Sequence, residues 1–288
     1  MPDIWESASI LAKLLLYAGI TGATGIAMIR LIFWDYVKCL DARLRRFSLG
    51  LAGVAVTAAI IGFLLRGAAL TGDIAGMVDR EMLGLLWGTS VGEAFTYRLA
   101  GIIVISIGLY LPVIGAWVSL AGGLIALWSF TQIGHIPDQE QTGIRLLLLL
   151  HLLGVSFWVG ILAPLRWLAR DPEYLAVAAN FGDKFGVMAS GIVAVLVLAG
   201  GLMAWLILGT LSLIFTTAYG LALVGKVTLV ALLLGLAAAN KLRFIPAMQA
   251  GNQKAAAHLA RSIELEITVI TAVLVATATL TSVLALPM

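Results

Sequence analysis

Long apolar runs, each close to the length needed to cross a lipid bilayer, recur along this chain from beginning to end. A membrane-spanning helix needs about 20 mainly apolar residues, because the hydrocarbon core is about 30 Å thick and a helix rises about 1.5 Å per residue. Runs of this length indicate helices, which satisfy their own backbone hydrogen bonds in lipid. We therefore predict an all-α, polytopic integral membrane protein in which residues 1–288 form a single transmembrane helical domain.

The composition supports this fold class. Of the residues, 61% are hydrophobic and 11% are charged, whereas about 25% of the residues of a soluble domain are charged. Between the second and third apolar runs, the stretch Thr71–Glu93 has an apolar stripe and predicts a helix at the membrane surface. The eight predicted spans are Ser9–Ile32, Phe47–Leu70, Ala94–Val113, Trp117–Ile133, Gly143–Trp167, Phe185–Leu208, Tyr219–Asn240 and Ile263–Leu286.

The basic residues predict the orientation of the chain. They concentrate in the loops after the first, fifth and seventh predicted spans, whereas the other loops are acidic or neutral. Cytoplasmic loops of membrane proteins carry the excess of Lys and Arg, so both termini are expected to face outward. An acidic outer face attracts cations. We interpret the net charge of +3 as anchoring to anionic membrane lipid and not as nucleic-acid binding.

Two of the three histidines lie close to the predicted outer boundary of the fifth span. His135 is in the loop before this span, and His151 lies roughly 10–12 Å inside it at about 1.5 Å per residue. A neutral imidazole is a good ligand for copper, zinc, iron or nickel, and an ionisable residue within a span suggests a functional site. The alternatives are a headgroup contact for His135 and a hydrogen bond between helices for His151.

Two further side chains are expected near His151. Met203, in the outer third of the sixth span, lies at a similar predicted depth, and its thioether would favour Cu(I). Most membrane methionines only fill space, so packing is the alternative role. Trp158 follows His151 by seven residues and therefore shares its helix face.

Lys226 lies seven residues inside the seventh span. A lysine there needs a carboxylate, a polar cavity or a route by which its ammonium reaches the membrane surface. Glu93 and Arg98 are at a comparable predicted height in the third span, which suggests a Glu93–Lys226 or a Glu93–Arg98 pair. The alternative is that both cations extend outward to the surface.

The remaining sequence features give weaker indications of function. Glu264 and Glu266 stand at the predicted cytoplasmic start of the last span. They could contact a cation as it leaves on that side, but the helix dipole already explains acidic residues at a helix start, and we favour that explanation. The sequence has no phosphate-binding Gly-x-x-x-x-Gly-Lys motif, no His-Glu-x-x-His and no Gly-x-Ser-x-Gly. We therefore expect no enzymatic activity.

Three segments in the second half of the chain, about residues 117–288, resemble the bacterial copper-resistance D (CopD) family. The first resembles its His-x-x-x-x-x-x-Trp-x-Gly signature, the second its Tyr-Gly, buried Lys and Asn-Lys/Arg pattern, and the third its Arg-Ser-x-x-x-Glu sequence. The first half of the chain matches in its general plan of four spans. The segments are HLLGVSFWVG (His151–Gly160), YGLALVGKVTLVALLLGLAAANKLRFIP (Tyr219–Pro246) and RSIELEI (Arg261–Ile267).

The resemblance implies an eight-span protein of the bacterial inner membrane that handles copper. Such a protein is thought to pass copper from a periplasmic, CopC-like partner toward the cytoplasm, and His135 and His151 are the candidate copper residues. One alternative is a di-histidine haem b cytochrome, although only one histidine lies well inside a predicted span. A second alternative is a structural or assembly protein without a transport role.

Overall fold

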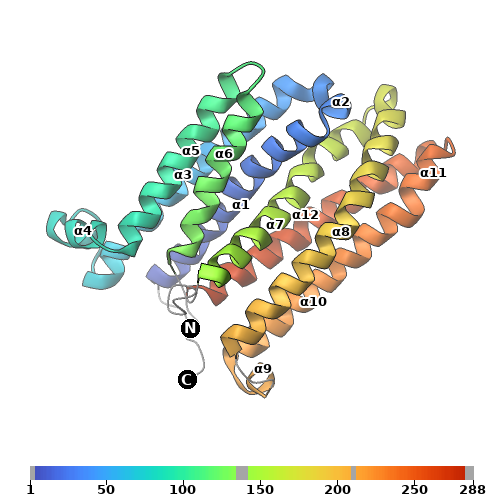
Figure 1. Ribbon diagram of the computed structural model, residues 1–288. Helices are drawn as coiled ribbons and strands as arrows, with labels where there is room; N and C mark the ends of the chain where they lie inside the picture. The colour runs from blue at the N-terminus through green and yellow to red at the C-terminus, as the bar shows by residue number, and fades with distance from the viewer. Residues whose placement is uncertain (1–3, 134–141, 209–211, 283–288) are drawn as a thin grey trace.

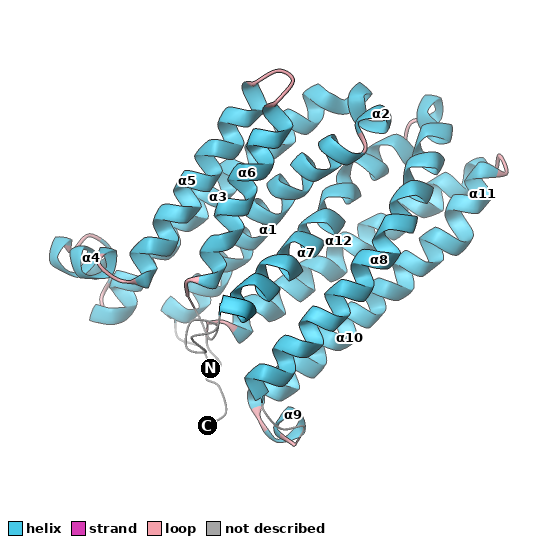
Figure 2. Cartoon of the chain, viewed as in Figure 1, coloured by secondary structure: helices cyan, strands magenta, loops and turns pink. Residues whose placement is uncertain are grey.

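The computed structural model describes residues 4–133, 142–208 and 212–282, and these form a bundle of long helices that run alongside one another (Figure 1). Figure 2 shows helices and loops and no strand in this part of the chain. The long helices are α1 (Ile4–Ile32), α3 (Asp41–Thr71), α5 (Ser90–Tyr110), α6 (Gly115–Trp128), α7 (Thr142–Ala169), α8 (Leu175–Leu208), α10 (Ala218–Ala239) and α12 (Gln253–Leu280). The short ones are α2 (Trp34–Val37), η1 (Lys38–Leu40), η2 (Ile74–Met77), α4 (Arg80–Trp87), η3 (Ser129–Thr131), η5 (Pro172–Tyr174), α9 (Leu213–Thr216), η6 (Asn240–Phe244) and α11 (Ile245–Gln249).

The fold is that of an all-α polytopic membrane protein, as predicted. In the described residues, seven helices are long and apolar enough to cross a membrane, and α6 with η3 forms a shorter apolar helix, Gly115–Thr131. This shorter helix packs closely on α5 because small residues line the contact. A Cβ atom added at Gly101 would lie 2.6 Å from the carbonyl oxygen of Gly122, so the two backbones meet directly.

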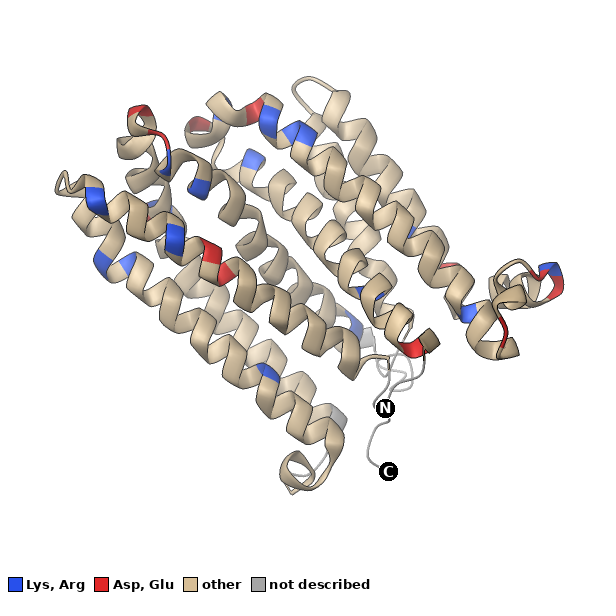
Figure 3. Ribbon diagram, turned by 180° about the vertical axis from the view of Figure 1, so that it is seen from behind, with Lys and Arg blue, Asp and Glu red and all other residues tan. Residues whose placement is uncertain are grey.

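The two ends of the bundle differ in the connections that they hold and in their content of Lys and Arg residues. The start of α1 and the end of α12 lie at the same end, where Lys13 Nζ donates a hydrogen bond of 2.6 Å to the carbonyl oxygen of Thr281. We call this the terminal end; it also holds α4, in the region where a surface helix was predicted. The opposite end, which we call the basic end, holds the α1–α3, α7–α8 and α10–α12 connections. Many Lys and Arg residues lie in the helices and connections at that end (Figure 3).

Several helices extend beyond their predicted spans. The last helix begins at Gln253 and not at Ile263, and the sixth begins at Leu175 and not at Phe185. Hydropathy marks the apolar part of a span, whereas polar and charged residues interrupt these extensions, among them Asp183 and Lys184 in α8 and Gln253 and Lys254 in α12. Other interactions stabilise these turns. The side chain of Asn252, for example, accepts a hydrogen bond from the backbone N–H of Lys254 and caps α12.

A close crossing between α1 and α7 determines which way α7 faces. A Cβ atom added at Gly25 would lie 2.0 Å from the carbonyl oxygen of Ser156 and 2.8 Å from Cα of Gly160. Only glycines allow this approach, so the Ser156 and Gly160 face of α7 is held against α1. The remaining faces of α7 are thereby directed toward α8 and α12, and they carry His151 and Trp158.

Candidate functional site

His151 lies in the contact between α7 and α8. A Cβ atom added at Gly200 of α8 would lie 3.6 Å from His151 Cε1, which is van der Waals distance, so the imidazole packs against α8 at Gly200. The ring nitrogen Nδ1 is buried and makes no hydrogen bond of regular distance and angle, although the backbone of Leu196 on α8 lies close enough to interact with the imidazole. Lys226 of α10 is near enough to act electrostatically on the ring. A buried nitrogen without a regular hydrogen bond is costly, and a bound metal ion is one way of satisfying it.

Met203 lies at the same helix contact. It is buried in a small apolar cluster with Ile144 of α7, against which Leu147 and Leu148 also pack. Because Met203 follows Gly200 by three residues, it lies about one turn, or 4.5 Å along α8, from the residue that contacts His151. The structure therefore brings Met203 and His151 to neighbouring positions of one interface, as their predicted depths suggested.

His135 lies outside the described residues. The remaining histidine, His258, is at the basic end, where its ring stacks on Phe244 with centroids 5.8 Å apart. In the part of the chain that the structure describes, no second histidine therefore opposes His151, as a haem with two histidine ligands would need. The same part holds no group of three or more His, Cys, Asp or Glu side chains that could bind a metal ion.

The predicted pairing of Glu93 with Lys226 or Arg98 is wrong. Glu93 is exposed, and Arg98 Nε instead donates a hydrogen bond of 3.3 Å to Ser129 Oγ. Lys226 is on α10, which lies on the other side of the bundle from α5 (Figure 1). The prediction relied on equal height along the membrane normal, which does not make two helices neighbours.

A second polar site, which sequence reasoning missed, surrounds Glu266. This side chain is 4% exposed and lies thirteen residues after the start of α12, about 20 Å along the helix. Trp158 Nε1 of α7 donates to its Oε2 at 3.1 Å, and Asn240 Nδ2 donates to its Oε1. The helix-dipole explanation of Glu266 is therefore wrong, because the residue lies in the middle of a helix and not in its first turn.

Asn240 occupies an unusual backbone position. It ends the regular part of α10 and begins η6, a π-helical turn, and such turns occur often at functional sites. Its Oδ1 is buried without a hydrogen-bond partner, and so is the hydroxyl of Ser262, one turn before Glu266 on α12. Trp158, Asn240, Ser262 and Glu266 form what we call the Glu266 cluster.

The Glu266 cluster unites the three segments singled out in the sequence. Trp158 comes from the His151–Gly160 segment, Asn240 from Tyr219–Pro246, and Ser262 and Glu266 from Arg261–Ile267. One feature of the sequence could have revealed this site. Each of these polar residues lies in or beside an apolar run and therefore needs a polar partner inside the membrane. Which of these residues meet depends on the order of the helices around the bundle.

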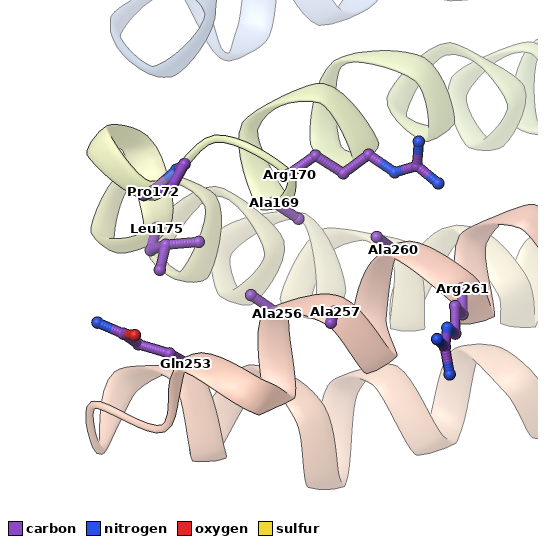
Figure 4. Close-up of a pocket in the computed structure, with 9 residues that line it drawn as sticks. All are labelled: Ala169, Arg170, Pro172, Leu175, Gln253, Ala256, Ala257, Ala260 and Arg261. Carbon is purple, nitrogen blue, oxygen red and sulfur yellow. The ribbon is translucent and has the colours of Figure 1, made fainter.

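A cavity of about 360 Å³ opens at the basic end, between the ends of α7, α8 and α12 (Figure 4). Alanines make up much of its lining, and Arg170 and Arg261 are among its lining residues. Arg170 also pairs with the exposed face of α12, because Arg166 and Arg170 both bind the carboxylate of Glu264. The full lining is Ala169, Arg170, Pro172, Leu175, Gln253, Ala256, Ala257, Ala260 and Arg261.

Comparison with known proteins identifies the family. The family model described as copper resistance protein D matches residues 179–280, and the one described as copper resistance protein D-like, N-terminal domain, matches residues 1–144. The second match is more specific than the general plan of four spans recognised in the sequence. The searches of curated proteins and of solved structures gave no match. The chain belongs to the copper resistance protein D family.

Proposed function

We propose that this protein binds copper near the terminal end of the bundle and passes it through the membrane toward the basic end. The observation that carries this proposal is the buried Nδ1 of His151, which lies between α7 and α8, with Met203 one helical turn along α8 from Gly200, the residue that the imidazole contacts. Imidazole ligates both Cu(I) and Cu(II), and a thioether biases a site toward Cu(I). Copper is the cargo in this proposal.

The orientation follows from the charge distribution. The basic end faces the cytoplasm of a bacterial inner membrane, and both termini face the periplasm. Acidic side chains in the α3–α5 connection, among them Asp73, Asp79 and Glu81, then lie on the periplasmic side and attract cations. A separate periplasmic, CopC-like protein delivers copper there, and the chain acts without an enzymatic step.

Lys226 suits a site that must release its ion. An ammonium group close to His151 repels a copper ion and therefore weakens its binding. Conduction requires an ion site that is favourable enough to fill but weak enough to empty. We therefore assign Lys226 the role of limiting the time that copper spends at His151.

The test is copper bound per protein, measured in detergent after loading under reducing conditions. Wild type, His151→Ala, His135→Ala and Met203→Leu are compared, with His258→Ala as the control because His258 lies at the basic end. We expect His151→Ala to lose most of the copper, His135→Ala to lose less, and His258→Ala to lose none. Met203→Leu should lose copper under reducing conditions only. Full copper stoichiometry in a His135→Ala, His151→Ala double variant would contradict the site.

A further inference from the structure

We propose that Glu266 is a proton-binding site within the membrane. We also propose that the Asn240 side chain forms a hydrogen bond with both the charged and the protonated form of Glu266. This inference rests on the geometry of the Glu266 cluster, which is separate from the copper residues. Only its link to transport rests on the proposed function.

The first step is that Glu266 is buried without a balancing charge. In the described residues, no Lys or Arg forms an ion pair with it. The basic side chains of the elements packed on α12 have other surroundings. Arg30 of α1 pairs with Asp41 at 2.8 Å, Arg166 of α7 pairs with Glu264, and Lys241 of η6 donates to Ser190 Oγ at 2.6 Å.

Three other basic groups on these elements have other neighbours, among them Arg243 of η6, whose guanidinium lies over the ring of Phe244. Lys226 of α10 interacts electrostatically with His151, and Lys13 of α1 donates a hydrogen bond to the carbonyl oxygen of Thr281 at the terminal end. A lone carboxylate in a span is costly, and taking up a proton removes that cost.

The second step is the pattern of donors and acceptors. When Glu266 is charged, it accepts N–H donors from Trp158 and Asn240, as the structure shows. When a proton binds to Oε1, the resulting O–H group needs an acceptor in place of the Asn240 N–H donor. Rotation of the Asn240 amide by half a turn presents its Oδ1, which has no partner in the present arrangement. Trp158 can donate to Oε2 in both states.

The third step is the route by which water and protons reach Glu266. The cavity at the basic end is lined by Ala260 and Arg261, directly before Ser262 of the cluster. Arg261, which lines this cavity (Figure 4), precedes Glu266 by five residues, about 7.5 Å along the helix, so the cavity lies on the basic-end side of the cluster along α12. In the other direction, Trp158 and His151 lie two turns apart on one face of α7, about 10.5 Å. The proton site thus lies between the basic opening and the proposed copper residue.

The experiment is infrared difference spectroscopy of the full chain in lipid vesicles without copper, recorded as the pH is raised from about 6, where exposed carboxyl groups are already ionised. The signal is the carbonyl stretch of a protonated carboxylic acid. Wild type and Glu264→Gln should show a band that disappears as the pH rises, because Glu264 is exposed and paired with arginines. Glu266→Gln should lack that band. An unchanged band in Glu266→Gln would overturn the proposal.

A second variant keeps the test valid if Glu266→Gln does not fold. Trp158→Phe removes one N–H donor that stabilises the charged carboxylate, so the acid band should persist to a higher pH than in wild type. Titration at the same pH in both proteins would overturn the assignment. A midpoint that moves with sodium concentration at constant ionic strength would also overturn it, since the ligand would then be a metal cation.

A separate experiment tests whether protonation of Glu266 is linked to copper transport. Copper uptake into vesicles is followed at several internal pH values for wild type and for Glu266→Gln. We expect the variant to bind copper as wild type does but to lose the dependence of uptake on pH. Retention of the wild-type dependence would overturn the link. If wild type itself takes up no copper, the proposed function fails, while the infrared result stands on its own.

Discussion

The crossing of α1 and α7 offers a quantitative test of the packing that orients His151 and Trp158. Substitution of Gly25 by alanine places a Cβ atom 2.0 Å from the carbonyl oxygen of Ser156 and 2.8 Å from both Cα and N of Gly160. All three contacts are backbone atoms, so no side chain can rotate away and the two helices must move apart. Overpacking of this kind costs about 1–3 kcal/mol.

A matched control is available on α3. A Cβ atom added at Gly53 would have no neighbour within 4 Å, and replacing a helical glycine by alanine in open space is favourable by roughly 0.5–1 kcal/mol. We measure the free energy of unfolding in detergent micelles for Gly25→Ala, Gly53→Ala and wild type. Gly25→Ala should be less stable than wild type, and Gly53→Ala at least as stable. Equal stability of the two variants would refute the close α1–α7 crossing.

Three other predictions concern orientation and the copper site. A cysteine at Ser7 should react with an impermeant thiol reagent in intact cells and one at Asn252 should not, because we assign these positions to the periplasmic and cytoplasmic ends; labelling of Asn252 would refute the orientation. Lys226→Met should retain copper longer in a dissociation assay, since it removes a nearby positive charge, and faster release would contradict the role given to Lys226. Copper occupancy of wild type should fall at low pH, because only neutral imidazole binds metal and protons compete with the ion; occupancy that rises as the pH falls would contradict histidine ligation.

The fold could be predicted from the sequence because lipid imposes one simple rule. Apolar runs such as Phe47–Leu70 and Tyr219–Asn240 are long enough to be helices, and both fall within helical segments of the structure. The ends of the helices could not be predicted in this way. The first turns of α12, beginning at Gln253, are polar and lie at the basic end, where hydropathy carries no signal.

The site could be predicted in part. His151 could be recognised because an ionisable residue within a span suggests a functional site, and Met203 because its thioether is a copper ligand at a similar predicted depth. Both residues lie in the contact between α7 and α8. Glu266 was misread because the start of α12 was placed ten residues too late. The Glu93–Lys226 pair failed for a different reason: hydropathy indicates depth along the membrane normal but not which helices are neighbours.

The central claim is that copper crosses the membrane through this protein by way of His151. The most direct measurement is copper uptake into vesicles that contain the purified full chain in one orientation, with empty vesicles as the background. We predict uptake above background for wild type and for His258→Ala, and little or none for His151→Ala. Uptake by His151→Ala equal to that of wild type, or wild-type uptake no greater than that of empty vesicles, would contradict the account.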